Sequence, residues 1–249
     1  MAYYKLHCNG GSGNSYKLAL YLNCAGLDWE PIGVDFAGGQ TRDPDWRAGT
    51  NAMGEVPVLE VNGQRMSQSG AILIWLAETT GKFAPGTDER FEALRWILFD
   101  NHKFTNNYAM HRFQNSLTAE PVHPAILAFL RSRVEASYSI VDKHLMDRAF
   151  VLGDRPTIVD FSMAGYVYYP KEETGFDIAA DFPELHAWRE RLAALPGWQP
   201  PYELMPVGSA ALDAATGISS AARMSEAISG TGFEAIPGCR SAHPGCCSS

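Results

Sequence analysis

The chain changes its pattern of secondary structure once, at residues 82–89. Segments typical of strands and helices alternate before this stretch, and only helical patterns follow it. The stretch contains Pro85 and Gly86, which interrupt regular structure. With 249 residues, the chain is long enough for two domains of ordinary size. We therefore predict an α/β domain over residues 1–81, a linker over 82–89 and an all-helical domain over 90–206.

The first domain is predicted to begin with a strand, a helix and a second strand. Residues 3–8 are typical of a short strand, and the glycine-rich turn at 9–13 leads into an apolar helix. The second strand is expected over 32–36. Further along, Asn62-Gly63 between extended segments favours a hairpin with a type I′ turn. An apolar helix over 70–79 completes the predicted domain.

Two long segments of the second domain carry apolar residues at every third or fourth position, which indicates one buried face on each helix. The expected buried residues are Phe91, Leu94, Trp96, Ile97 and Leu98 in the first helix and Ile126, Leu127, Leu130, Val134, Tyr138, Val141 and Leu145 in the second. Thr157 and Asp160 then form a capping-box pattern that predicts the start of a buried helix. One more amphipathic helix is expected from Pro183 onward.

The charge balance argues against two classes of partner. Asp and Glu number 28 against 20 Lys and Arg, whereas binding to nucleic acid or to an anionic membrane needs basic clusters. No run approaches the roughly 18 apolar residues of a membrane-spanning helix, and the first residues do not resemble a secretion signal. We expect a cytoplasmic protein with neither a nucleic-acid nor a membrane partner.

The end of the chain has a composition of its own. After Pro206, Ala, Ser, Gly and Thr dominate, so we predict a low-complexity, disordered tail over 207–249. Three of the five cysteines lie in the last eleven residues, and the other two are Cys8 and Cys24. This uneven placement favours neither a disulfide framework nor a zinc site, and we expect no metal.

Four short motifs occur in a characteristic order. They are Asn51-x-x-Gly54-Glu55-Val56-Pro57-Val58-Leu59, Ser67-Gln68-Ser69-x-Ala71-Ile72, Thr157-x-x-Asp160 and Pro183-x-Leu185-x-x-Trp188. Over about residues 3–203 the chain resembles the cytosolic glutathione transferases, in particular bacterial-type members with a serine or asparagine at the N-terminal site. The resemblance implies a thioredoxin-like α/β domain followed by an all-helical domain, with Pro57 preceded by a cis peptide bond.

The same resemblance implies a glutathione site at Glu55-Val56-Pro57 and Gln68-Ser69. An extended peptide can pair with the backbone of Val56 as an added strand would. The helix start at Ser69 offers free N–H groups to the γ-glutamyl carboxylate, although a serine here could equally serve only as a helix cap. Many family members carry Glu where this chain has Gln68, so a charge partner for the ligand's ammonium is lost. For the glycine carboxylate the candidates are Arg42, Arg47, Gln40 and Asn51, and the sequence does not choose among them.

Catalysis in this family requires a lowered pKa of the glutathione thiol, from about 8.5 toward neutrality. A hydroxyl or amide donor at the start of the first helix can provide this. The candidates are Ser12, Asn14 and Ser15, of which at most two should touch the sulfur. Cys8 lies six residues before Asn14 and is interpreted as a buried strand thiol.

For the second substrate, the resemblance implies an apolar cleft between the domains. It would be lined by Asn9 from the loop after the first strand and by Phe104, Tyr108 and His111 from the helical domain. Aromatic rings with a few polar groups suit an aromatic or conjugated electrophile. Aromatic residues at helical spacing can also be core residues, so the sequence leaves both interpretations open.

The leading hypothesis is a glutathione transferase, in which bound glutathione thiolate attacks an apolar or aromatic electrophile. A homodimer with a role in detoxification is implied by the resemblance. The second hypothesis is a glutathione-dependent disulfide reductase or peroxidase on the same site, favoured if Asn14 rather than Ser15 meets the sulfur. The third is a non-catalytic regulatory protein that only binds glutathione.

Overall fold

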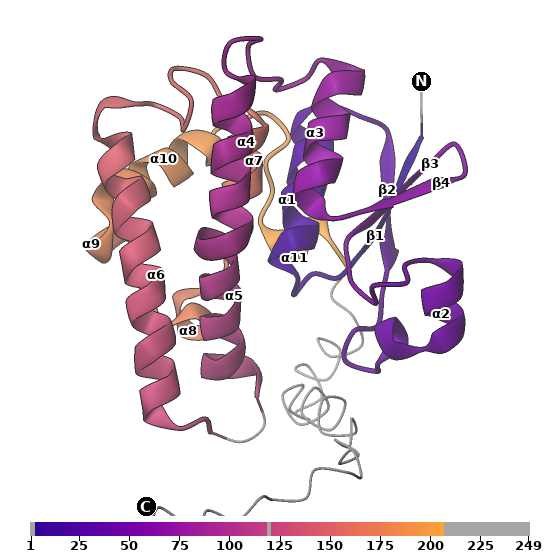
Figure 1. Ribbon diagram of the computed structural model, residues 1–249, viewed down its shortest axis with the longest axis horizontal. Coiled ribbons are helices and arrows are strands. Elements are labelled where there is room, and N and C mark those ends of the chain that lie inside the picture. The colour runs from indigo at the N-terminus through magenta and orange to yellow at the C-terminus, as the bar shows by residue number, and fades with distance from the viewer. Residues whose placement is uncertain (1–2, 119–120, 207–249) are drawn as a thin grey trace, which may run out of the picture.

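The computed structural model describes residues 3–118 and 121–206 of the chain. It consists of a four-stranded α/β domain and a second domain built from helices (Figure 1). The predicted low-complexity tail, 207–249, lies outside the described residues. Within those residues, no helix has the length and apolar character needed to cross a membrane.

The α/β domain alternates strands and helices as predicted. Its strands are β1 (Tyr4–Cys8), β2 (Trp29–Gly33), β3 (Val58–Val61) and β4 (Gln64–Ser67), and its helices are α1 (Gly13–Cys24), α2 (Pro44–Gly49) and α3 (Ser69–Thr80), with a 3-10 turn η1 (Gln40–Arg42). The second strand begins at Trp29, earlier than the predicted 32–36, because β2 pairs in parallel with β1 from Trp29 opposite Tyr4. The hairpin turn is confirmed: Asn62 and Gly63 both have positive φ, at 50° and 75°.

The sheet has the strand order β2-β1-β3-β4, with β1 parallel to β2 and antiparallel to β3. Helices α1 and α3 lie between this sheet and the helical domain, whereas α2 lies apart from them (Figure 1). Leu6 and Leu59 pair across β1 and β3 and are fully buried, as is Leu18 on α1. The loops at the start of α1 and α3 therefore leave this core and carry the polar residues of the site.

The helical domain begins with one long, nearly continuous helical segment. It runs through α4 (Arg90–Phe99), η2 (Asp100–Phe104), α5 (Thr105–Arg112) and η3 (Phe113–Leu117). The elements that follow are α6 (Pro124–His144), η4 (Leu145–Asp147), α7 (Ile158–Met163), α8 (Lys171–Thr174), α9 (Ile178–Asp181), α10 (Pro183–Ala193) and α11 (Pro201–Leu204). The capping box is confirmed, because Thr157 and Asp160 exchange side-chain and backbone hydrogen bonds at the start of α7.

The predicted buried face of α4 is wrong in part. Trp96 and Ile97 are buried, but Phe91 and Leu98 are 79% and 61% exposed, and Leu94 is exposed as well. Apolar residues surround most of α4, and the helix buries the side that also carries Ala93, which packs against α7. In α6, Ile126 is also exposed and Leu127 and Leu130 are half-buried, whereas Val134, Tyr138 and Val141 are buried as expected, as is Leu145 just beyond the helix.

A buried ion pair joins the two domains. The Nζ of Lys17 on α1 lies 2.7 Å from Oδ2 of Asp100, and both side chains are completely buried. The carboxylate of Asp100 also accepts hydrogen bonds from Thr105 at 2.5 Å and from Ser162 at 2.6 Å. Because Lys17 lies one turn after Asn14, this pair holds the beginning of α1 against the helical domain.

Candidate active site

The segment before β3 presents an unpaired backbone edge. The Val56–Pro57 peptide bond is cis, as the resemblance implied, and Val56 is half-buried. Within the described chain, neither the N–H nor the C=O of Val56 makes a hydrogen bond. Asn51 supports this loop, because its Nδ2 donates to the carbonyl of Glu55 at 3.0 Å and its Oδ1 accepts from the N–H of Met53 at 3.1 Å. The free groups of Val56 can therefore pair with an extended peptide.

The start of α3 is a second open site. The first backbone hydrogen bond of this helix runs from the N–H of Ile72 to the carbonyl of Gln68, so the N–H groups of residues 69–71 have no partner among the described residues. Such groups, with the positive end of the helix dipole, favour a carboxylate. Gln68 has a φ of 72°, a strained conformation for a residue other than glycine and one that is common at binding sites.

The side chain of Gln68 holds the carboxylate of Glu55 beside the start of α3. Its Nε2 donates to Oε2 of Glu55 at 3.0 Å. Both residues were predicted to contact glutathione, and the structure places their side chains together. The negative charge that Gln68 itself lacks is therefore supplied by Glu55, in a position to attract an ammonium group.

The three candidate sulfur contacts at the start of α1 differ in access. Ser12 is the N-cap of α1, and its hydroxyl accepts from the N–H of Ser15 at 3.2 Å. Asn14 is half-buried, and its Oδ1 accepts from the hydroxyl of Ser69 at 3.5 Å. The Nδ2 of Asn14 makes no hydrogen bond within the described residues and remains available as a donor. Ser15 is fully buried with its hydroxyl unpartnered, so of these three residues only Ser12 and Asn14 are partly exposed.

The basic and amide residues before Pro57 divide into two groups. Gln40 and Asn51 shape the loop, since the Oε1 of Gln40 accepts from the N–H of Asp35 at 2.8 Å. Arg47 donates from Nε to the carbonyl of Thr41 at 3.1 Å, and its guanidinium covers Gly54. Arg42 ends η1 and Arg47 lies in α2, so both guanidinium groups belong to the segment before Pro57. Either group can form a charge-assisted hydrogen bond with a ligand's carboxylate.

The four predicted contacts of the second substrate lie mostly inside the protein. Asn9 shapes its own loop, since its Nδ2 donates to the carbonyl of Val34 and its Oδ1 accepts from Gly11. Phe104 is buried and stacks on Tyr138 with ring centroids 4.2 Å apart. His111 is buried with Nδ1 3.1 Å from the carbonyl of Thr174. Tyr108 is also buried, and its side chain lines a cavity inside the helical domain.

Sequence reasoning missed the residues that hold the loop before α1. Arg112, almost fully buried, donates from Nη1 to the carbonyl of Gly11 at 2.8 Å and forms an ion pair with Glu173. The hydroxyl of Tyr169 donates to the carbonyl of Gly10 at 2.7 Å. These contacts span 101 and 159 residues, and no local pattern in the sequence indicates them.

The fold and the site together define a thioredoxin-like domain with an unpaired backbone edge at Val56, completed by a helical domain. The sequence matches the family described as glutathione S-transferase, N-terminal domain, over residues 3–78, and glutathione S-transferase, C-terminal domain, over residues 124–191. The chain belongs to the glutathione S-transferase family.

Three proteins illustrate the similarity. A maleylacetoacetate isomerase from Rhizobium meliloti is 30% identical over 195 residues, which cover 76% of this chain and 90% of the isomerase. The crystal structure of a glutathione S-transferase from Xanthobacter autotrophicus Py2 has a TM-score of 0.71 and 32% identity, with 81% of this chain and 98% of that chain covered. A glutathione transferase homologue from Lodderomyces elongisporus, solved with two glutathione molecules per subunit, has a TM-score of 0.74 and 26% identity, with 83% and 100% covered.

Proposed function

We propose that the chain is a glutathione transferase that joins the sulfur of glutathione to a small apolar or aromatic electrophile. The observation that carries the proposal is the set of unpaired groups in one region: the backbone of Val56 and the free N–H groups at the start of α3. Glutathione has one complementary group for each. Its cysteine backbone pairs with Val56, and its γ-glutamyl carboxylate binds at Ser69.

The charges of the ligand also find partners in this arrangement. The γ-glutamyl ammonium lies beside Glu55, whose carboxylate Gln68 holds at 3.0 Å. The glycine carboxylate binds to Arg42 or Arg47, which line the loop before Pro57. Hydrogen bonds between charged groups contribute about 1.5–3 kcal/mol each, so these ends determine affinity while the centre of the ligand stays free to react.

Asn14 and Ser12 stabilise the thiolate in this proposal. Asn14 has a free Nδ2 donor beside Ser69, and Ser12 lies two residues earlier at the N-terminus of α1. The thiol loses its proton to solvent, and the thiolate then attacks the electrophilic carbon while the leaving group departs with the bonding electron pair. Ser15 plays no direct part, because its side chain is buried.

A second candidate activity uses the same site. A glutathione-dependent disulfide reductase or peroxidase is favoured by the burial of Ser15, since asparagine is then the residue that meets the sulfur. In the reductase reaction the thiolate attacks a substrate disulfide, one sulfur leaves as thiolate, and a second glutathione resolves the mixed disulfide. A regulatory protein that binds glutathione without turnover remains the alternative to both enzymes.

One experiment separates these functions. The thiol pKa of bound glutathione is titrated by its ultraviolet absorbance in the wild type and in Asn14→Ala, with Ser15→Ala as the matched control. We expect a pKa well below 8.5 in the wild type, an increase of about one to two units in Asn14→Ala, and little change in Ser15→Ala. A wild-type pKa near the free value would refute both enzymatic functions. Turnover of hydroxyethyl disulfide but not of 1-chloro-2,4-dinitrobenzene would favour the reductase.

We also propose that the chain forms a homodimer through α4. Phe91, Leu94 and Leu98 recur at helical spacing, and all three are exposed. Beside them lies an open cavity of about 880 Å³ between α3 and α4. Contiguous exposed apolar surface of this kind marks an interface between proteins.

Light scattering on the full chain tests the dimer. The double variant Phe91→Asp/Leu98→Asp should be monomeric, because a dimer would bury both charges. Met146→Asp, which changes an apolar side chain that is 71% exposed outside α4, is the control and should remain a dimer. A monomeric wild type would refute the proposal.

A further inference from the structure

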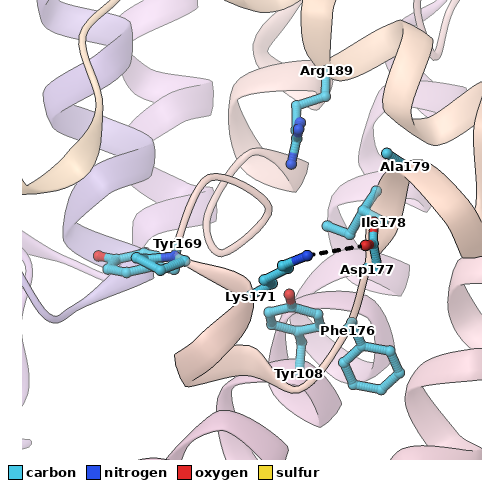
Figure 2. A pocket seen from close by; sticks show the side chains of 9 residues that line it. Tyr108, Tyr169, Lys171, Phe176, Asp177, Ile178, Ala179 and Arg189 are labelled. Atoms are coloured by element: carbon cyan, nitrogen blue, oxygen red, sulfur yellow. Dashed lines mark hydrogen bonds and ion pairs between the residues drawn. The ribbon is translucent and has the colours of Figure 1, made fainter.

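A cavity of about 260 Å³ lies inside the helical domain, and all of its lining residues come from that domain (Figure 2). It is bordered by α5, by the segment that contains α8 and α9, and by α10. Its apolar walls are the rings of Tyr169 and Phe176 and the side chain of Ile178. Ligand pockets usually measure about 300–1,000 Å³, so this cavity suits a small molecule.

Two polar groups at the cavity lack the hydrogen bonds that buried groups normally make. The hydroxyl of Tyr108, a residue that is only 1% exposed, makes no hydrogen bond of good geometry within the described residues, although the side chain of Thr174 lies close enough to lower its pKa slightly. The Nε of Arg189 is likewise buried and unpartnered, although its Nη1 donates to the carbonyl of Val167 at 3.1 Å. Figure 2 shows the two side chains pointing into the cavity from opposite ends. Because an unsatisfied buried donor costs about 1–3 kcal/mol, a ligand that accepts from both would be stabilised.

The charges around the cavity favour an acid at the end that Arg189 occupies. Lys171 and Asp177, both at the exposed rim, pair with each other at 3.4 Å and largely cancel. Glu190 lies 3.6 Å from Nη2 of Arg189, but its side chain is exposed and leaves Nε unused. At the other end, burial raises the pKa of Tyr108 to about 12, so its hydroxyl remains a hydrogen-bond donor at neutral pH.

We propose that this cavity binds a small, flat organic acid, whose carboxylate accepts from Arg189 and whose second oxygen accepts from the hydroxyl of Tyr108. The aromatic body of the acid lies against Tyr169, Phe176 and Ile178. This site is separate from the candidate glutathione site, because none of the candidate glutathione contacts lines the cavity. Tyr169 lies between the two regions, since its ring forms a wall of the cavity and its hydroxyl donates to Gly10 in the loop before α1. The proposal therefore does not depend on the function proposed above.

Calorimetric titration of the full chain with 4-hydroxybenzoate tests the proposal. We expect one molecule to bind per chain, and 4-hydroxybenzamide and benzoate to bind at least about tenfold more weakly, since each lacks one of the two recognised groups. Arg189→Gln should weaken binding of 4-hydroxybenzoate about tenfold or more, because the charged donor is lost. Arg148→Gln, which removes an exposed arginine outside the cavity, is the matched control and should leave binding unchanged.

Tyr108→Phe is a second variant that tests the proposal even if Arg189→Gln fails to fold. It keeps the ring and removes a hydroxyl that makes no hydrogen bond of good geometry within the described residues, so the protein should fold about as stably as the wild type. It should bind 4-hydroxybenzoate no better than benzoate. Saturating glutathione should leave the affinity for 4-hydroxybenzoate unchanged. The proposal is wrong if 4-hydroxybenzoate does not bind at about 10 mM, if glutathione displaces it, or if both Arg189→Gln and Tyr108→Phe bind it as the wild type does.

Discussion

Replacing Lys17 should destabilise the protein strongly, because it breaks a buried ion pair. Lys17→Met keeps most of the side-chain volume but removes the charge that pairs with Asp100 at 2.7 Å. Both side chains are fully buried, so the carboxylate of Asp100 would keep only its hydrogen bonds from Thr105 and Ser162. Removing one partner of such a pair typically costs about 3–5 kcal/mol, because a buried charge remains uncompensated. We expect the free energy of unfolding to fall by about that amount.

Urea denaturation followed by fluorescence measures the effect. With a slope of about 3 kcal/mol per molar urea, the loss corresponds to a shift of the midpoint by about 1–2 M. The double variant Lys17→Met/Asp100→Asn removes the orphaned charge and should recover part of the stability. A loss below about 1 kcal/mol in Lys17→Met, or a double variant less stable than Lys17→Met, would refute the reasoning.

Three further predictions concern the site and its surroundings. Gly54→Ala should lower the free energy of unfolding by about 1–3 kcal/mol, because φ is 68° at this position and an added Cβ would lie 2.7 Å from the carbonyl of Thr41. The same change should weaken glutathione binding measured by calorimetry, and an unchanged affinity would contradict the prediction. Arg112→Met should lower kcat/KM at least about tenfold in steady-state kinetics, since the loop at Gly11 loses its buried anchor, whereas the exposed control Arg133→Met should not. Burial lowers the pKa of His111 in the folded protein. As the pH drops below about 6.5, the unfolded chain therefore binds a proton on His111 more readily than the folded protein does, and stability should fall. In thermal unfolding, His111→Gln should lose less stability across that pH range.

Much of the candidate site could be located from the sequence because its residues are neighbours in the chain. Glu55-Val56-Pro57 and Gln68-Ser69 lie in short motifs whose backbone conformation is set locally, and the structure places both segments in one region through the hydrogen bond between Gln68 and Glu55. The candidates at the start of α1 were also chosen by their position in the sequence. Their accessibility was not, because burial of Ser15 depends on how α1 packs against other elements.

In the helical domain, too, the sequence predicted the elements but did not fully predict which residues are buried. The spacing of apolar residues predicts that α4 is a helix, but Phe91, Leu94 and Leu98 belong to the outward side. Periodicity indicates that a segment is helical, and it cannot say which of its apolar residues pack inside the chain and which remain exposed. The predicted substrate contact Tyr108 shows the same limit, since its position on α5 did not reveal that it lines a cavity of the helical domain.

The sequence by itself determined the two-domain architecture, the hairpin at Asn62-Gly63, the helix cap at Thr157 and the motifs of the binding edge. These features depend on residues only a few positions apart, whose backbone preferences and hydrogen bonds are local. Only the tertiary structure decided that Lys17 pairs with Asp100, that Arg112 holds the loop at Gly11, and that Ser15 is buried while Asn14 is half-buried. Each of these depends on packing between segments far apart in the chain, where burial and charge pairing arise only after the domains fold together.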